Sequence, residues 1–414
     1  MHEQISSFLQ QRIDANDFPS AVYLVAEKGE IVYHDALGYA VVQPERIEAK
    51  IDTIYDLASL TKPLVTGLIC AKLTENTELS LADKIGRFFG KNHFDESREN
   101  DLKGLLTHTS GYPGWKPFYL LENSPGFDDE DYGVASDSNN EIRKFVLDEI
   151  FGTPHKIQPR SNVIYSDLNF LLVGYLIEEM FGRDLQNVSW NEIFMRQGLQ
   201  RTAFCGGGSR HETAASEKGN EYEKQTCIEL GYLQRHSTAG GSDGTASIPA
   251  PKDAKSPVAM ALGSDKFRNY QIWGEVHDGN AYFMGGIAGH AGLFSTAEEV
   301  FKIAQQFLPN YTTLLKPETC DLFRTNFTPE MNEDRSFAFQ LASTKNSTAG
   351  TKMSPESFGH NGFTGTSLWI DPVKERVFVL LTNRTHNHPL PFVNINSVRR
   401  RFHDLVIDLL DKNR

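Results

Sequence analysis

The sequence has few cysteines, and they are not arranged as metal ligands. Among 414 residues there are four, Cys70, Cys205, Cys227 and Cys320, and no two form a Cys-x-x-Cys pair. This spacing does not suggest a zinc ribbon or a disulfide framework. We therefore expect reduced thiols with a structural role.

Basic residues are also fewer than acidic ones. Lys and Arg number 41 against 54 Asp and Glu, which gives a net charge of −13 at pH 7. An acidic chain repels phosphate backbones and anionic membrane surfaces, so we expect neither nucleic acid nor a membrane as a partner. No apolar run is long enough to span a bilayer, and residues 1–7 lack the features of a signal peptide. The sequence predicts a cytoplasmic protein, although an exported protein with its signal removed would share this pattern.

The composition is that of a folded globular protein. Hydrophobic residues make up 39% and charged residues 23% of the chain, which is far from the composition that favours disorder. The length suits two closely packed domains.

Strand signals occur at both ends of the chain. Residues 3–15 have a helical pattern, and the apolar runs 21–26 and 31–33 that follow read as a β-hairpin. Near the other end, 366–370 and 376–382 are rich in β-formers and precede an amphipathic final helix.

Between the two ends the pattern is mostly helical, which predicts how the chain is divided. Residues 1–56 and 271–414 are expected to form one α/β domain, and residues 57–270 a mostly helical one. The active site is expected in the cleft between them. A long loop is predicted near 205–270, and its part 236–265, rich in Ser, Gly, Ala and Pro, is expected at the surface.

The segment Ser59-Leu60-Thr61-Lys62 begins a helical pattern. Residues three apart share one face of a helix, so the Lys62 ammonium can reach the Ser59 hydroxyl. The positive end of the helix dipole favours a developing alkoxide. Serine is also a common helix cap, which is the alternative interpretation, but no other serine of this chain has a lysine three residues on.

Tyr165-Ser166-Asp167 stands directly before a second helical pattern over 168–180. A tyrosine near a lysine ammonium can have its phenol pKa lowered enough to act as a base. The alternative is a buried ring whose hydroxyl is hydrogen-bonded.

A third segment, His360-Asn361-Gly362, lies in the glycine-rich stretch 358–367. Closely spaced glycines allow a substrate to approach the backbone and leave N–H groups free to bind an oxyanion. A glycine-rich edge strand is the alternative.

In this order and at these separations, the three segments resemble the serine β-lactamase and penicillin-binding-protein superfamily, whose signature includes Ser-x-x-Lys and Lys-Thr-Gly. The resemblance covers most of the chain and is closest to the class C-like branch, which comprises class C β-lactamases, D-aminopeptidases, DD-peptidases and β-lactamase-like esterases. It implies an antiparallel sheet flanked by helices together with an all-helical domain. It implies neither a cofactor nor a metal ion.

The resemblance also implies roles for individual residues. Ser59 would attack the acyl carbon, and Lys62 or Tyr165 would take its proton; which of the two is the kinetic base is left open. The backbone N–H groups of Ser59 and Phe363 would bind the oxyanion. Six further residues would contact the substrate: Asp167, His360, Asn361, Gly362, Tyr112 and Trp115.

Several of these residues have alternatives or depart from the family pattern. Tyr112 and Trp115 either line the pocket or anchor the turn that holds them. Asp167 stands where class C β-lactamases have an amide side chain, and His360 replaces a lysine that helps to bind the β-lactam carboxylate. Both departures disfavour an efficient penicillinase.

Three histidines outside the motifs, His108, His277 and His290, are expected to be structural, since no His-Glu-x-x-His occurs.

The sequence therefore favours a serine hydrolase that acts through an acyl-enzyme as an esterase or amidase. A D-stereospecific peptidase, either a DD-peptidase or a D-aminopeptidase, or a class C-like β-lactamase is the alternative. A catalytically inactive binding or scaffold homologue is a third hypothesis, against which the intact motifs speak. The expected partner is a small ester, amide or D-amino-acid-containing substrate, and the oligomeric state is left open.

Overall fold

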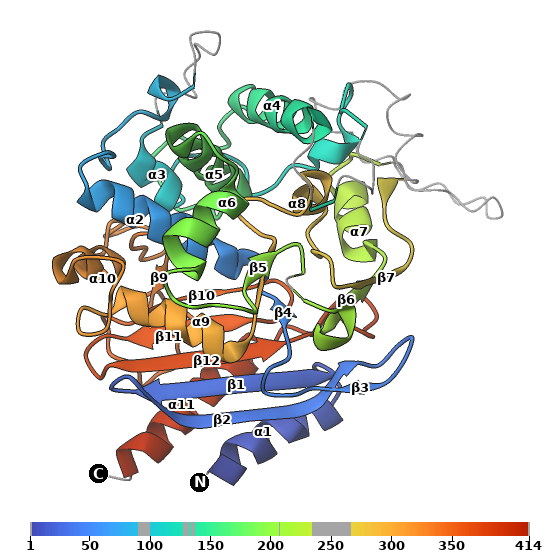
Figure 1. Cartoon of the computed structure of the whole chain (residues 1–414), viewed down its shortest axis with the longest axis vertical. Coiled ribbons are helices and arrows are strands. Elements are labelled where there is room, and N and C mark those ends of the chain that lie inside the picture. Colours follow the sequence, from blue (N-terminus) through green and yellow to red (C-terminus); the bar gives the residue numbers. More distant parts are fainter. Residues whose placement is uncertain are drawn as a thin grey trace, which may run out of the picture.

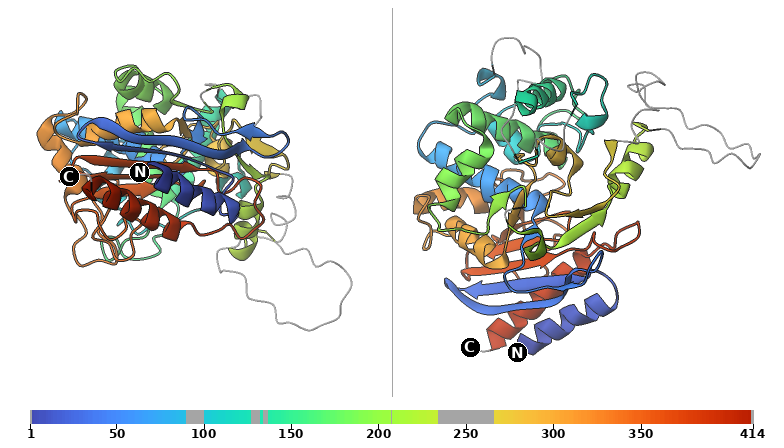
Figure 2. Two further views of the ribbon diagram at one scale, coloured as in Figure 1. Left: turned by 90° about the horizontal axis from the view of Figure 1, so that it is seen from below. Right: turned by 45° about the vertical axis from the view of Figure 1, so that its right-hand side comes forward.

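The computed structural model describes residues 2–89, 100–126, 132–133, 137–206, 208–233 and 266–412. The segment 236–265, predicted as a surface loop, lies outside these residues. Both ends of the described chain lie at the same side of the molecule, beneath a broad sheet (Figures 1 and 2).

That sheet has seven strands in the order β3-β2-β1-β12-β11-β10-β9, and all neighbours are antiparallel. The first and last long strands pair, with Ala21 opposite Thr382, so both ends of the chain build the sheet as predicted. The strands are β1 (Ser20–Glu27), β2 (Glu30–Val41), β3 (Ile47–Glu48), β9 (Gln340–Leu341), β10 (Phe358–Asn361), β11 (Ser367–Asp371) and β12 (Arg376–Thr382).

Helices cover both faces of this sheet, and most of them lie on one side of it (Figure 1). They are α1 (His2–Asp14), α2 (Leu68–Glu75), α3 (Leu102–Leu106), α4 (Asp137–Phe151), α5 (Asp167–Phe181), α6 (Leu185–Ser189), α7 (Glu221–Glu229), α8 (Gly279–Phe283), α9 (Ala297–Ala304), α10 (Asp321–Arg324) and α11 (Asn396–Lys412). Among the described helices, none has the length and apolar character that crossing a membrane requires.

The side chains of β1 point alternately into two hydrophobic cores, one on each face of the sheet. Tyr23 and Val25 pack with α1 and α11 on one face, while Val22 and Leu24 belong to the larger core on the other face. Successive side chains of a strand point to opposite faces, so a central strand covered on both sides is apolar throughout. The predicted α/β fold with a flanked antiparallel sheet is confirmed.

Two small sheets connect the large one to the helices. β4 (Tyr55–Asp56), β8 (Leu293–Ser295) and β5 (Ala203–Phe204) form one, and β6 (Ala215–Lys218) and β7 (Gln271–Trp273) form the other.

The prediction of a long loop near 205–270 is wrong for its described parts, because β6 and α7 lie within it. Helix α7 has almost no apolar periodicity, and tertiary contacts support it: the Glu223 carboxylate accepts a hydrogen bond from the Gly279 N–H at 2.8 Å. The division into domains at residues 57 and 270 stays a prediction.

Candidate active site

Ser59 lies in a short turn of helix, Ala58–Leu60, directly after β4. The preceding Ala58 has φ +47°, a left-handed conformation that costs an alanine roughly 1–2 kcal/mol. The Asp56 carboxylate supports it, accepting hydrogen bonds of 2.8 Å from the N–H groups of Ala58 and His277. Strain held by surrounding contacts in this way is common at functional sites.

Lys62, one turn later, is fully buried, and its ammonium has polar contacts with three groups besides Tyr165. Its ammonium donates to Ser59 Oγ at 2.9 Å and to the carbonyl of His290 at 3.1 Å. The third contact is an ion pair of 2.7 Å with Asp167 Oδ1. Burial by itself would lower the pKa of Lys62, but Asp167 and Tyr165 outweigh it, and the pKa lies above the ordinary lysine value.

Tyr165 is positioned by His108 at the start of α5. The two rings lie 4.4 Å apart, and His108 Nδ1 accepts a hydrogen bond of 3.0 Å from the N–H of Ser166. His108 therefore braces the turn, in agreement with the structural role expected for it. The Tyr165 ring also lies 5.0 Å from the Lys62 ammonium.

The prediction that Lys62 lowers the pKa of Tyr165 below its usual value is wrong. Burial raises this pKa more strongly than the neighbouring Lys62 lowers it, because a phenolate loses its hydration in this position. The Tyr165 hydroxyl is buried beside Lys62 and Ser59, whose polar groups lower its pKa by less than burial raises it. Tyr165 and Lys62 thus both carry their protons in the resting site.

Ser59, Tyr165 and Asp167 meet at a cavity of about 690 Å³. The tertiary structure brings them together from the turn before α2 and the N-terminus of α5. This is the arrangement that the sequence predicted for its first two motifs.

The third motif forms another wall of the cavity, and its His360 ring lies 5.8 Å from the Tyr165 ring. Thr364 Oγ1 donates to the Asp56 carbonyl at 2.7 Å, and Thr366 Oγ1 donates to the Leu57 carbonyl at 3.0 Å. These bonds hold the 362–366 turn against the backbone that precedes Ser59. A Cβ on Gly362 would lie 2.5 Å from the Leu57 carbonyl oxygen, so the close approach requires glycine.

The two N–H groups expected to bind an oxyanion are available. Within the described part of the chain, neither the Ser59 N–H nor the Phe363 N–H donates a hydrogen bond, and both residues line the cavity. Such free donors can stabilise negative charge that develops on a substrate carbonyl.

His360 and Asn361 also line the cavity, but neither supplies a charge there. Burial, together with the positive charges of Lys62 and Arg335, holds the pKa of His360 well below its usual range. Its ring is therefore neutral at pH 7. Asn361 exchanges hydrogen bonds with Thr348 at 3.0 and 3.1 Å.

The two aromatic residues of the 110–115 turn differ in position. Trp115 lines the cavity together with Pro113. Tyr112 does not: its side chain is fully buried and packs edge-on against His155, with ring centres 4.9 Å apart. The predicted pocket role of Tyr112 is therefore wrong, and it is a packing anchor.

Three arginines that line the cavity were missed: Arg335, Arg384 and Arg399. Arg399, on α11, donates to the carbonyls of Gly362 and Thr366 at 3.1 and 2.9 Å. Arg384, just after β12, donates to the carbonyl of Phe363 at 2.8 Å. Both line the cavity.

Among the described residues no carboxylate forms an ion pair with Arg384 or Arg399, whereas Arg335 pairs with Glu333 at 2.6 Å. Burial and the neighbouring Arg384 lower the pKa of Arg399 to about 9, and burial lowers that of Arg384 as well. One signal was present in the sequence: Arg399 falls three residues before Phe402, on the apolar face of the last helix.

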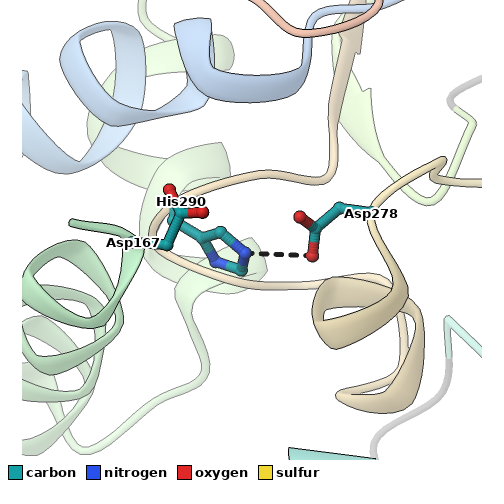
Figure 3. Close-up of side chains that lie close together, drawn as sticks. All are labelled: Asp167, Asp278 and His290. Carbon is teal, nitrogen blue, oxygen red and sulfur yellow. Dashed lines mark hydrogen bonds and ion pairs between the residues drawn. The ribbon is translucent and has the colours of Figure 1, made fainter. Parts of the chain in front are cut away.

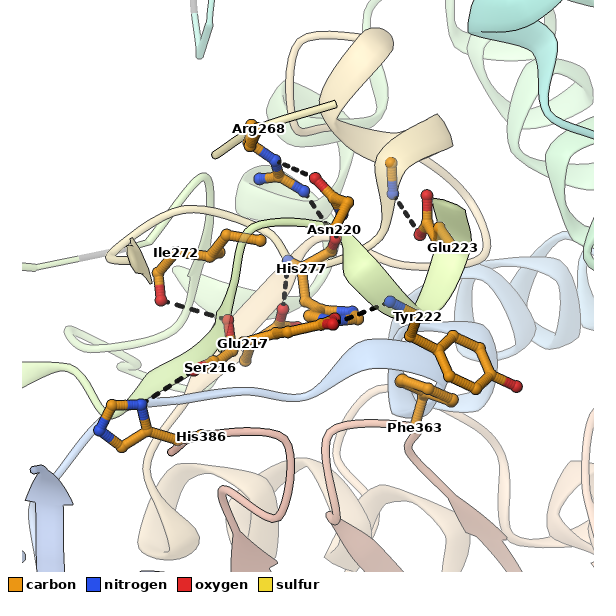
Figure 4. Close-up of polar contacts among 12 residues, drawn as sticks. Ser216, Glu217, Asn220, Tyr222, Glu223, Arg268, Ile272, His277, Phe363 and His386 are labelled. Atoms are coloured by element: carbon orange, nitrogen blue, oxygen red, sulfur yellow. Dashed lines mark hydrogen bonds and ion pairs between the residues drawn. The ribbon is translucent and has the colours of Figure 1, made fainter. Parts of the chain in front are cut away.

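Acidic residues form another part of the wall, around the start of α7 (Figure 4). Glu223 lines the cavity and accepts hydrogen bonds of 2.8 Å from the Gly279 N–H and the Tyr119 hydroxyl. Burial and the nearby Asp278 raise the pKa of Glu223 to about 7. Behind it, His277 pairs with Glu217 at 2.7 Å.

Asp167, Asp278 and His290 lie close together (Figure 3), and Asp167 contacts the Lys62 ammonium. Their ligand atoms are all within 4.8 Å of one another, close enough to hold one metal ion. His290 pairs with Asp278 at 3.0 Å, however, and the Lys62 ammonium already supplies a cation to Asp167. The proximity of Asp167 to Asp278 and His290 could not be deduced from spacing, because these residues belong to segments far apart in the chain.

Comparison with known proteins identifies the family. A profile of the family described as Beta-lactamase matches residues 5–399. The chain belongs to the β-lactamase family. The predicted resemblance to serine β-lactamases and penicillin-binding proteins is thereby confirmed, and the chain is a serine hydrolase that acts on an ester or amide.

Individual relatives span most of the chain. A protein of Escherichia coli (strain K12) named "Putative D-alanyl-D-alanine carboxypeptidase" is 28% identical over 403 residues, which cover 93% of this chain and 82% of that protein. A protein of Salmonella gallinarum with the same name is 29% identical, covering 93% and 83%.

Two solved structures of this β-lactamase-family fold are similar at low identity. The octameric penicillin-binding protein homologue from Pyrococcus abyssi has a TM-score of 0.66 at 17% identity and covers 98% of this chain and 77% of its own. EstCE1, a hydrolase with promiscuous acyltransferase activity, has a TM-score of 0.66 at 17% identity and covers 97% of both chains. These likenesses show the fold.

Proposed function

We propose that this chain is a carboxypeptidase that removes a C-terminal D-amino acid from a small peptide, with Ser59 as the nucleophile. The observation that carries the proposal is the pair Arg384 and Arg399, two cations at the cavity with no anionic partner among the described residues.

Ser59 attacks the carbonyl carbon of the last peptide bond. Its proton passes into the network that contains Lys62 and Tyr165, and the N–H groups of Ser59 and Phe363 bind the oxyanion. The terminal amino acid leaves, and water then releases the acyl group from Ser59. Proton transfer needs no cofactor in this scheme.

Removing a cation from water costs several kcal/mol unless an anion compensates it. Arg399 is 5% exposed, and its lowered pKa reflects that uncompensated cost. A substrate carboxylate that reaches Arg384 and Arg399 would supply the missing charge, and arginine is well suited to hold a carboxylate. Both side chains bond to the 362–366 turn, so such a carboxylate would lie beside the oxyanion site.

The relatives support the same substrate class. The E. coli and Salmonella proteins bear the name of a D-alanyl-D-alanine carboxypeptidase, whose substrate ends in a free carboxylate. The neutral His360 leaves the recognition of this carboxylate to the arginines.

A short-chain ester hydrolase is the second candidate. Trp115, Tyr222 and Phe363 give the cavity aromatic surface, which would hold an uncharged acyl or alcohol group. Such a substrate would leave the two arginines without a partner.

A panel of matched substrates tests the proposal. We expect a peptide that ends in D-Ala-D-Ala with a free carboxylate to be cleaved with a higher kcat/KM than the same peptide with an amide cap, and than its L-Ala counterpart. Ser59→Ala should abolish both turnover and labelling by a fluorophosphonate. Faster cleavage of p-nitrophenyl esters with no preference for the free carboxylate would favour the second candidate, and turnover retained in Ser59→Ala would reject both.

A further inference from the structure

Asp167 is the carboxylate that faces the amine beside the nucleophile. It is the first residue of α5, where its N–H donates to the Gly114 carbonyl at 2.9 Å. Its side chain is 17% exposed, lines the cavity and lies 2.7 Å from the buried Lys62 ammonium. Three atoms thus form a chain: Ser59 Oγ, Lys62 Nζ and Asp167 Oδ1.

The other charged or titratable groups near Asp167 cannot easily take the Ser59 proton. Tyr165 carries its proton and its pKa is raised. Asp278 is bonded to His290 and to the Ala281 N–H at 3.0 and 2.8 Å. Asp167 is the carboxylate that contacts Lys62 directly.

We propose that Asp167 is the final proton acceptor of acylation, acting through Lys62. This rests on the proposed acyl-enzyme mechanism with Ser59 as nucleophile. Asp167 is thereby a positioning and proton-relay residue, since it reaches the reacting oxygen only through the lysine.

The proton balance is as follows. One proton moves from Lys62 Nζ to Asp167 Oδ1, and rotation about the Cε–Nζ bond turns the free lone pair toward Ser59. As the bond from Ser59 Oγ to the substrate carbon forms, the Oγ–H bond breaks and its proton goes to Nζ. The carbonyl electron pair moves onto the oxygen held by the two N–H groups. When the intermediate collapses, Asp167 returns its proton through Lys62 to the leaving group.

Substrate binding favours the first step. A ligand in the cavity covers the exposed part of the Asp167 carboxylate and removes water from it. Loss of water disfavours a charged pair relative to its neutral form, so the pair becomes able to pass its proton when the substrate is in place. After the rotation, the two remaining N–H groups of Lys62 can face the His290 carbonyl and Asp167, which keeps the amine in position.

The test is the pH dependence of kcat/KM for p-nitrophenyl acetate, which reports acylation without requiring a peptide substrate. We expect Asp167→Asn to lower kcat/KM about 10²-fold at pH 7 and to move the acid limb of the profile to higher pH. In that variant only molecules in which Lys62 has already lost its proton can accept one from Ser59. The exposed Asp321→Asn, with the same charge change, is the matched control and should leave the profile unchanged.

A shift of the acid limb of Asp167→Asn to lower pH would overturn the proposal. If a Tyr165 phenolate were the acceptor, loss of the Asp167 charge would lower the pKa of Tyr165, because Asp167 raises it. The acid limb would then move to lower pH, and the rate would be equal or higher. An unchanged rate and profile would also overturn the proposal.

A second variant separates relay from structure. Asp167→Ala should be slow but partly rescued by added formate, which can enter the cavity and replace the carboxylate. A folded Asp167→Ala protein that formate does not rescue would count against the relay. Ser59→Ala separates the two proposals: if it retains activity, the acyl-enzyme mechanism itself fails, whereas an inactive Ser59→Ala with the opposite Asp167→Asn shift rejects the relay alone.

Discussion

Replacing Arg399 with methionine removes a buried cation while preserving most of the side-chain length. Arg399 supports the 362–366 turn through the Gly362 and Thr366 carbonyls, so the change will also disturb the oxyanion site. That structural effect applies to every substrate. The effect on carboxylate recognition applies only to substrates with a free C-terminal carboxylate. The ratio of kcat/KM between a free-carboxylate peptide and its amide-capped form therefore isolates this effect.

The size of the effect follows from the bond that is lost. A hydrogen bond to a charged group contributes about 1.5–3 kcal/mol, and about 1.4 kcal/mol corresponds to a factor of ten. We therefore expect Arg399→Met to lower the preference for a free carboxylate over an amide cap about 10- to 100-fold. Arg384 remains in the variant and can still bind the carboxylate, so part of the preference is kept.

The assay compares kcat/KM for a D-Ala-D-Ala peptide and its amide-capped form in wild type and variant. Arg401→Met, on the exposed side of the same helix, loses the same charge and should keep the wild-type preference. If Arg399→Met lowered kcat/KM equally for both substrates, the arginine would act on the turn alone, and carboxylate recognition by Arg399 would be refuted.

Three further predictions concern the proton network, the turn and the acidic wall. Lys62→Met should slow fluorophosphonate labelling of Ser59 about 10²-fold or more, since it removes the positioned amine; labelling at the wild-type rate would exclude Lys62 from the chemistry. Gly362→Ala should abolish ester turnover and lower the free energy of unfolding by about 1–3 kcal/mol, because its Cβ would lie 2.0 Å from Thr366 Oγ1; a fully active variant would contradict this packing. Glu223 has a pKa raised from 4.5 to about 7 in the folded state, so its stabilising contribution is complete below its unfolded pKa and is lost as the pH rises through about 7. Glu223→Gln should therefore flatten the fall in Tm between about pH 5 and pH 8, and an unchanged slope would contradict the assignment.

Local patterns were sufficient for most of the architecture. The helix over 3–15, the hairpin that follows it and the pair of strands before the last helix are found close to their predicted positions. Each depends on the spacing of apolar residues against one buried face, which the sequence contains. Helix α7 was missed because its stability depends on long-range contacts such as that of Glu223 with the Gly279 N–H, and a polar helix of this kind leaves no periodic signal.

In the predicted site, too, some features follow from sequence spacing and others depend on the fold. Ser59 and Lys62 lie one helical turn apart, and this distance can be deduced from spacing alone. The direction of the Tyr165 pKa could not be deduced, because it depends on how much water the fold removes from the phenol. The burial of Tyr112 likewise depends on packing against His155.

The family, the sheet built from both chain ends and the residue types at the nucleophile could all be deduced from motifs and from the order of local patterns along the chain. Which charges lie close together could be seen only in the folded protein: Asp167 contacts Lys62, and Arg384 and Arg399 line one cavity. Charge interactions depend on distance and burial, and both are set by elements far apart along the chain.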